Sequence, residues 1–161
     1  MMKIFKFLIV SVLGATQFVA YGQDVNPFVE GLIKGKFKTE FRDYRVLRVT
    51  NDLKAQTKSD ESLYLIVERL LTFKSQTQCG RIKFWLEQPA TKTKWEQLGG
   101  ELNICEDGLP PWGICPNTQM APITSKCADG SPPQQTAEVK EAIQSAVDRG
   151  GSIKMPKPPP K

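Results

Sequence analysis

The stretch Thr72-Phe73-Lys74-Ser75-Gln76-Thr77-Gln78-Cys79-Gly80 decides the fold, because it joins a strongly apolar run to the first cysteine of the chain. The run before it, residues 63–71, is dense in leucine, isoleucine, valine and tyrosine. An amphipathic helix is the alternative for this run, but its density of strand-forming residues favours a buried strand. Cys105 and then Pro111-Trp112 follow downstream, and the other segments can be placed around Cys79 and Cys105.

Residues 1–22 have the three parts of a secretory signal peptide. Lys3 and Lys6 form a basic start, residues 7–13 are apolar, and Ala20 and Gly22 supply small residues for cleavage. The apolar run is shorter than the ~20 residues that cross a bilayer. We therefore expect a secreted, extracellular chain with no membrane span.

Secretion makes disulfides the expected state of the four cysteines, Cys79, Cys105, Cys115 and Cys127. Four cysteines allow three pairings, and the sequence alone leaves all three open. A zinc site is the competing interpretation, but no two cysteines have the close spacing of zinc ligands and the chain has no histidine. We predict two disulfides and no metal.

Short strand-like segments separated by turn residues dominate the middle of the chain. Asn51-Asp52, Gln88-Pro89 and Gly99-Gly100 supply turns, with a bulge or corner at the paired glycines and a polar loop at 54–61. Five or six strands in succession predict a closed antiparallel barrel or a sandwich. The expected strands are residues 44–49, 63–72, 82–86, 95–98 and 102–105.

Residues 28–41 carry two conflicting patterns. Asn26-Pro27 is a helix start, and apolar residues follow at near-helical spacing. Gly31 and Gly35 oppose a helix, since each costs about 1 kcal/mol relative to alanine. A strand over 32–41 is the alternative, and a short helical turn leading into a strand would use both signals.

The C-terminal part changes character after Trp112, where prolines interrupt regular structure. Thr136 begins a predicted amphipathic helix that ends at Asp148-Arg149-Gly150 and packs its apolar face on the barrel. Residues 152–161 alternate lysine with proline and are expected to form a disordered, extended tail. The predicted organisation is a signal peptide (1–22), a β-domain (23–128), a linker with a helix (129–151) and the tail (152–161).

From Thr72 onward the residues resemble the netrin-like domain, specifically the N-terminal domain of the tissue inhibitors of metalloproteinases. The matching positions are the threonine, serine and Cys-Gly of the opening stretch, a hairpin over 95–99, a cysteine at a strand end, and a following Pro-Trp; they are Thr72, Ser75, Cys79, Gly80, Cys105, Pro111 and Trp112. The resemblance spans about residues 29–112 and implies a five-stranded, OB-like closed β-barrel.

One departure from that family bears on mechanism. The inhibitors open with Cys-x-Cys, whose free amine and carbonyl chelate the protease zinc, and this chain has no cysteine before Cys79. The resemblance therefore implies a rewired pairing, Cys79 with Cys105 and Cys115 with Cys127. It also implies a contact ridge at Ser75, Gln76, Thr77 and Gln78.

The sequence favours a binding protein over an enzyme. With no histidine, the usual general base at neutral pH is missing, and no cofactor motif is present. Glu101, Glu106 and Asp107 could form an acidic pair or a calcium site, although solvated acids are the more common outcome and no EF-hand spacing is present. The net charge of +5 falls to +3 without residues 1–22, and basic residues are scattered among acids, which disfavours nucleic acid as a partner.

Three functions follow as hypotheses. The first is a secreted netrin-like binding protein whose partner is an extracellular protein, either a metalloproteinase or a matrix component, without inhibition by zinc chelation. The second is a cystatin-like secreted protease inhibitor, in which residues 27–41 form a helix and four later strands wrap around it. The third is a structural component of the extracellular matrix.

Overall fold

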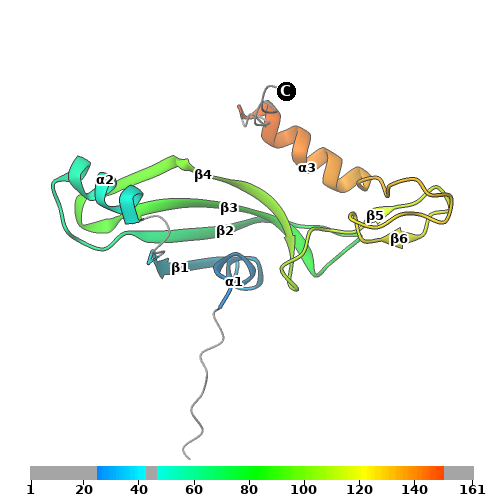
Figure 1. Ribbon diagram of the computed structural model, residues 1–161, viewed down its shortest axis with the longest axis horizontal. Coiled ribbons are helices and arrows are strands. Elements are labelled where there is room, and N and C mark those ends of the chain that lie inside the picture. The colour runs from blue at the N-terminus through cyan, green and yellow to red at the C-terminus, as the bar shows by residue number, and fades with distance from the viewer. Residues whose placement is uncertain (1–24, 43–46, 151–161) are drawn as a thin grey trace, which may run out of the picture.

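The computed structural model describes residues 25–42 and 47–150. The expected signal peptide (1–22) and Lys/Pro tail (152–161) lie outside these residues. An elongated four-stranded antiparallel sheet runs through the described part, with α1 against one face, α2 at one end, and α3 and a small hairpin at the other (Figure 1). No helix in the described ranges is long and apolar enough to cross a membrane.

Residues 28–41 form the short helix followed by a strand that would reconcile their helix and strand signals. Helix α1 (Pro27–Lys34) begins at Asn26, whose side chain accepts a hydrogen bond from the Phe28 N–H at 3.0 Å. Gly35 ends it in the left-handed region (φ 81°), and β1 (Lys36–Glu40) starts at the next residue. Glycine is suited to this position because it adopts a positive φ without steric cost.

Gly31 has a low helix propensity, but the packing of α1 against the sheet explains why glycine stands there. A Cβ at this position would lie 2.3 Å from Val67 Cγ1, so the missing side chain lets α1 lie close to the sheet. Helix α1 contacts all four strands. Helix α1 contributes Leu32 to the core. The buried residues of this core are leucines, isoleucines, a valine and a tryptophan, namely Leu32, Leu53, Leu63, Leu65, Val67, Ile82, Leu86, Trp95 and Ile104.

The sheet is open, and the expected five-stranded closed barrel is not found among the described residues. Strands β2 (Tyr64–Thr72), β3 (Cys79–Gln88) and β4 (Thr93–Cys105) follow β1 in the order β1-β2-β3-β4. Strands β1 and β4 are therefore opposite edges and do not pair with each other. The coarser expectation of a β-rich fold with a C-terminal helix is confirmed.

The missing strand is the one expected at residues 44–49. Residues 47–49 begin α2 (Leu47–Thr57), and 43–46 lie outside the described part. Leu53 is 4% exposed and belongs to the core, and this tertiary contact outweighs the local strand preference of the β-branched residues at the start of the segment. The helix also takes in the first half of the loop expected at 54–61, and Lys58 follows its end with φ 53°.

The predicted strands at 63–72 and 82–86 are confirmed as β2 and β3. The short 3-10 turn η2 (Pro89–Thr91) joins β3 to β4. Strand β4 contains the bulge expected at its paired glycines. Phe84 pairs with Gly100 and Leu86 with Trp95, so residues 96–99 all oppose Trp85. A Cβ on Gly99 would lie 1.9 Å from the Phe84 carbonyl oxygen, which requires glycine there.

The C-terminal part forms a small lobe beyond the end of the sheet, and α3 returns from this lobe over the sheet (Figure 1). Strands β5 (Gly113–Ile114) and β6 (Met120–Ala121) pair as a small hairpin. Helix α3 (Ala137–Asp148) starts at Thr136, whose hydroxyl accepts from the Val139 N–H at 3.4 Å. Its predicted start and end are both confirmed.

Candidate binding site around Trp112

The Cys79–Cys105 disulfide fixes the strand ends from which the candidate site is built. The two cysteines lie directly opposite each other on β3 and β4 and are 1% and 3% exposed. Phe73, Val139 and Ala142 cover them, so α3 packs on this disulfide. Cys115 pairs with Cys127, and both pairings agree with those that the netrin-like resemblance implied.

The loop at residues 73–78 is tightly held on both sides. The Phe73 N–H donates to the Cys79 carbonyl at 2.9 Å, and the Cys79 N–H donates to the Gln76 carbonyl at 2.8 Å. On the other side, the Glu138 carboxylate accepts from the N–H groups of Lys74 and Ser75 and from the Ser75 hydroxyl. These hydrogen bonds, the one from the Lys74 N–H foremost, hold the pKa of Glu138 below its ordinary value of 4.5.

Gln76 is the central residue of this loop and is only 6% exposed. Its Nε2 donates to the Trp112 carbonyl at 3.1 Å, and its Oε1 accepts from the Trp112 N–H at 2.7 Å. One buried amide thus satisfies both backbone groups of Trp112 and fixes the position of that residue.

The Trp112 side chain itself points to solvent and is 45% exposed, in contrast to Trp85 (8%) and Trp95 (4%) in the interior. Leu109, at 58%, and the exposed Pro110 lie beside it along the chain, while Pro111 is buried. We call Leu109, Pro110 and Trp112 the Trp112 ridge.

The structure gives the four residues of the sequence-predicted ridge different positions. Thr77 and Gln78 are exposed at the loop tip, and Ser75 is exposed but bonded to Glu138. Gln76 is buried and acts as a support. Through Gln76, the loop therefore supports the backbone of Trp112.

Three turns of identical design surround the two disulfides, and the sequence analysis missed them. In each turn, the cysteine N–H donates to the backbone carbonyl of the residue four positions later. The N–H of that later residue donates in turn to the side chain of an Asp or Asn, which lies two positions after the cysteine. The segments are Cys105-Glu106-Asp107-Gly108-Leu109, Cys115-Pro116-Asn117-Thr118-Gln119 and Cys127-Ala128-Asp129-Gly130-Ser131.

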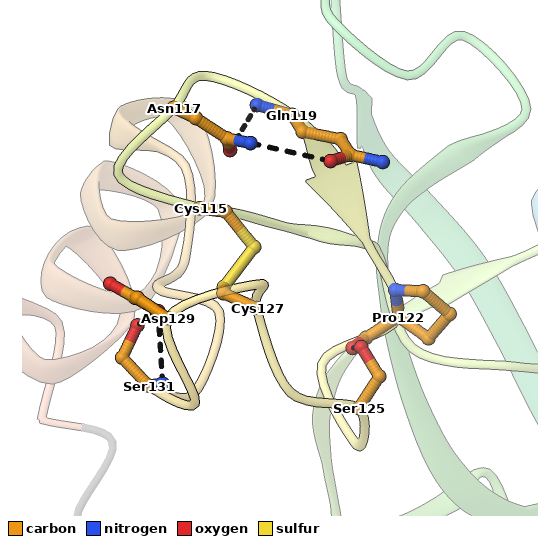
Figure 2. Close-up of a disulfide and its surroundings, with 8 residues drawn as sticks. All are labelled: Cys115, Asn117, Gln119, Pro122, Ser125, Cys127, Asp129 and Ser131. Atoms are coloured by element: carbon orange, nitrogen blue, oxygen red, sulfur yellow. Dashed lines mark hydrogen bonds between the residues drawn. A yellow bond between two sulfur atoms is a disulfide. The ribbon is translucent and has the colours of Figure 1, made fainter.

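Figure 2 shows the second and third of these turns, with the Cys115–Cys127 disulfide between them. The fourth position of each turn is left-handed, with φ of 81° at Gly108, 64° at Thr118 and 82° at Gly130. The shared signal in the sequence is a cysteine, then any residue, then Asp or Asn, and then Gly or Thr. It sets the shape of the lobe next to the Trp112 ridge.

Several grooves lie beside α3 in the described part of the chain, and two of them share Asn103 in their lining. The smaller, of about 220 Å³, lies between the Trp112 ridge and Ile123, with Val139 at its α3 side. The larger, of about 760 Å³, runs between α3 and the bulge of β4. Its apolar wall consists of Ile143, Ala146 and Val147, and its opposite side carries charged residues of β3 and β4.

The charged side of the larger groove is internally paired. Arg81, which is 6% exposed, donates through Nε to Glu101 at 2.6 Å, and Arg149 at the end of α3 reaches the same carboxylate at 3.1 Å. Burial alone would raise the pKa of Glu101, but its hydrogen bonds and attraction to Arg81 and Arg149 lower it overall. Lys83 pairs with Glu96 at 2.8 Å.

The acidic residues considered as a calcium site are not brought together as ligands. Glu101 is occupied by two arginines, while Asp107 caps its own turn by accepting from the Leu109 N–H at 2.9 Å. Over residues 25–42 and 47–150, no group of three or more His, Cys, Asp or Glu is arranged to hold a metal ion. Comparison of the chain with protein-family models, curated proteins and solved structures returns no match.

Proposed function

We propose that this chain is a secreted protein-binding module whose contact surface is the Trp112 ridge. The observation that carries the proposal is a half-exposed tryptophan on a backbone that a buried glutamine holds at both polar groups. A large amphipathic side chain presented on a rigid backbone loses little entropy on binding. Tryptophan is also the residue type most enriched among binding hot spots.

The two disulfides support an extracellular location, because such bonds persist in oxidising compartments. Placed at the strand ends and within the lobe, they rigidify the neighbourhood of the ridge rather than the centre of the sheet. This distribution suits a domain that presents a preformed surface to a macromolecule.

The proposed partner class is a protease, for which the chain would act as an inhibitor or carrier. The netrin-like interpretation keeps its support from the disulfide pairing, while the open sheet weakens it. The cystatin-like alternative gains support from α1, which precedes four antiparallel strands and lies across them. The cystatin-like alternative loses support because α1 ends at Lys34, whereas that alternative expects one continuous helix to residue 41.

Binding measurements with the purified mature chain test this proposal. We would titrate it against a panel of matrix metalloproteinases, a papain-type cysteine protease and intact extracellular matrix, following both residual activity and direct binding. The variant Trp112→Ala should lose binding by 2 kcal/mol or more, roughly thirtyfold, if the ridge is a hot spot. Ile33→Ala, which truncates a 50% exposed side chain on α1, is the matched control and should bind as the wild type does.

Two results would contradict the proposal. Unchanged affinity of Trp112→Ala for a partner that the wild type binds would remove the ridge as the contact surface. Hydrolysis of a substrate by the chain itself, retained after every protease contaminant is removed, would contradict a binding role.

A further inference from the structure

Strand β4 forms an edge of the sheet that no other strand covers in the described part of the chain (Figure 1). An edge strand presents unpaired N–H and C=O groups to which the backbone of another chain can bind. The opposite edge, β1, has only five residues, and its exposed Lys36 and Lys38 are of the residue type that protects edges against such pairing. Strand β4 has 13 residues and is the better acceptor of a further strand.

The register of β4 shows which of its backbone groups face this edge. The Cys105 N–H donates to the Leu109 carbonyl at 2.8 Å, so Cys105 makes no ladder hydrogen bond through its N–H to β3. Hydrogen-bonded and non-hydrogen-bonded pairs alternate along an antiparallel ladder, and the register is unbroken over residues 100–105. The N–H and C=O groups of Asn103 and Glu101 therefore point to the free edge, and no described residue hydrogen-bonds to these four groups.

The free stretch is short because it is closed at both ends. The bulge at 96–99 lies before it, and beyond it the Leu109 carbonyl already occupies the edge beside Cys105. A second copy of β4, paired antiparallel about Leu102, would bring its own Gly99 against that carbonyl. Because Gly99 belongs to the bulge, which is fixed in the sheet, the second copy could not bend away there, whereas a flexible peptide could.

We propose that this edge binds an extended peptide segment of a partner protein, which runs antiparallel to β4 and approaches from the Trp112 ridge. One peptide residue would pair with Asn103, and the residue two positions later would pair with Glu101. Three peptide residues thus satisfy all four edge groups. A parallel segment would need five residues to reach the same groups and would extend into the turn after Cys105.

The side chains of such a peptide would meet two apolar surfaces. Residues directly opposite each other in an antiparallel pair lie on the same face of the sheet, with Cβ atoms about 4.5–5.5 Å apart. The peptide residue opposite Asn103 therefore lies beside the smaller groove, which Asn103 lines together with Trp112 and Ile123. The next peptide residue lies on the opposite face beside the half-buried Leu102, which packs on the core. Apolar side chains fit both positions.

This inference rests on the proposed function for its site, the Trp112 ridge, and deepens that function by giving the partner a conformation. It adds the claim that the partner contributes backbone hydrogen bonds as well as side chains. Substitutions at Trp112 and at the edge of β4 test the two claims separately.

Hydrogen exchange measures the state of the edge. In the free mature chain the amide protons of Glu101 and Asn103 should exchange fast, whereas those of Leu102 and Ile104, which bond to β3, should exchange slowly. The probe is a set of peptides selected on the mature chain from a phage-displayed library of random dodecapeptides. Their binding should slow exchange at Glu101 and Asn103.

A pair of substitutions at Asn103 isolates the backbone donor. Asn103→Ala removes the side chain and the hydrogen bond that it accepts from Arg81 at 2.8 Å, but it keeps the outward N–H. Asn103→Pro removes that N–H as well, and an edge strand tolerates proline where the N–H faces away from the ladder. The selected peptides should therefore bind Asn103→Pro roughly tenfold more weakly than Asn103→Ala.

N-methylation of the peptide gives the same test on the wild-type chain, so the result does not depend on the folding of the proline variant. Methyl groups placed on successive peptide amides should weaken binding at alternate residues, because only every second N–H of a paired strand faces β4. Circular dichroism of both Asn103 variants checks that they remain folded.

The outcomes separate this inference from the proposed function. Equal binding to the two Asn103 variants without an alternating N-methyl pattern overturns the inference, and a loss of that binding in Trp112→Ala would leave the proposed function standing. Edge-dependent binding that Trp112→Ala leaves unchanged supports the pairing and counts against the proposed function alone. Selection of no peptide above the level found on an unrelated folded domain overturns the inference. Slow exchange at Glu101 and Asn103 in the free chain, whether monomer or dimer in sedimentation velocity, also overturns it, because the edge would then be occupied already.

Discussion

Replacement of Thr118 by glycine should stabilise the protein, although it removes a side chain. Thr118 is the left-handed position of the second cysteine-headed turn, and its counterparts in the other two turns are Gly108 and Gly130. A left-handed conformation costs an L-residue about 1–2 kcal/mol, and a β-branched side chain is poorly suited to it. Glycine removes that strain but gains about 0.4–1 kcal/mol of conformational freedom in the unfolded chain.

The difference predicts a net gain of about 0.5–1 kcal/mol for Thr118→Gly. Nothing distant opposes it, because the Thr118 hydroxyl is exposed and bonds only to the adjacent Asn117 carbonyl. Equilibrium urea unfolding with the disulfides intact measures this gain, and a rise of roughly 2–4 °C in Tm should accompany it. The reverse substitution, Gly130→Thr, should destabilise by about 1 kcal/mol, and Thr118→Ala should give little change because alanine keeps the strain.

A loss of stability in Thr118→Gly would refute this reasoning. It would mean that the threonine side chain stabilises the turn by more than the strain costs. A gain of equal size in Thr118→Gly and Thr118→Ala would point instead to the branched threonine side chain as the destabilising group, since only glycine relieves a positive φ.

Three further predictions concern the helices and disulfides. Because the pKa of Glu138 is lowered in the folded chain, its contribution to stability is present above the ordinary glutamate value of 4.5 and is lost as pH falls below that value. Glu138→Gln should therefore weaken the loss of stability at acid pH, as measured by unfolding curves from pH 6 to pH 2. An unchanged loss of stability in this variant would show that the Glu138 carboxylate is not its cause. Gly31→Ala should destabilise by about 1–2 kcal/mol in urea unfolding despite the better helix propensity of alanine, since the new Cβ would overlap Val67, and a neutral result would show that α1 can shift away from the sheet. The Cys115–Cys127 disulfide, whose cysteines are 6% and 8% exposed, should be reduced before Cys79–Cys105 under limiting reductant. Peptide mapping of trapped thiols measures the order of reduction. The opposite order would mean that α3 does not shield the Cys79–Cys105 disulfide.

The parts of the fold that the sequence predicted are those in which one local signal dominates. Strands β2 and β3 are dense in apolar and β-branched residues, and the Thr136 cap stands at the start of a regular apolar stripe. In these segments propensity, pattern and tertiary packing favour the same structure. The bulge in β4 was also predicted, since paired glycines within a strand pattern have few other uses.

The errors come from segments in which tertiary contacts decide. Residues 47–49 favour a strand locally, yet they belong to a helix because Leu53 is drawn into the core. Gly31 was weighed as a cost to a helix, whereas its missing side chain is what allows α1 to lie against Val67. Neither the hydrophobic periodicity of a sequence nor its helix propensity reports how closely a helix packs against a sheet. The closed barrel was inferred by counting strands, and residues 47–49, which were expected to belong to one of them, form the start of α2.

The candidate site shows the same limit at the level of single side chains. The resemblance to the netrin-like domain implied one contact ridge at Ser75, Gln76, Thr77 and Gln78, and it did not distinguish the four side chains. A polar residue becomes buried only where partners satisfy its hydrogen bonds, and both partners of Gln76 are backbone groups 36 residues away. Those partners cannot be read from the loop, and they reverse the role of Gln76 from contact residue to support.

That reversal changes how substitutions in the loop should be interpreted. Loss of the Gln76 amide would leave the Trp112 N–H and carbonyl without their partners in a partly buried site, at a cost of about 1–3 kcal/mol. A binding defect in Gln76→Ala would therefore report on how firmly Trp112 is held, whereas Thr77→Ala and Gln78→Ala would test direct contact. Only the pair of results separates the loop as a surface from the loop as a platform, and the buried amide with its two bonds favours the platform.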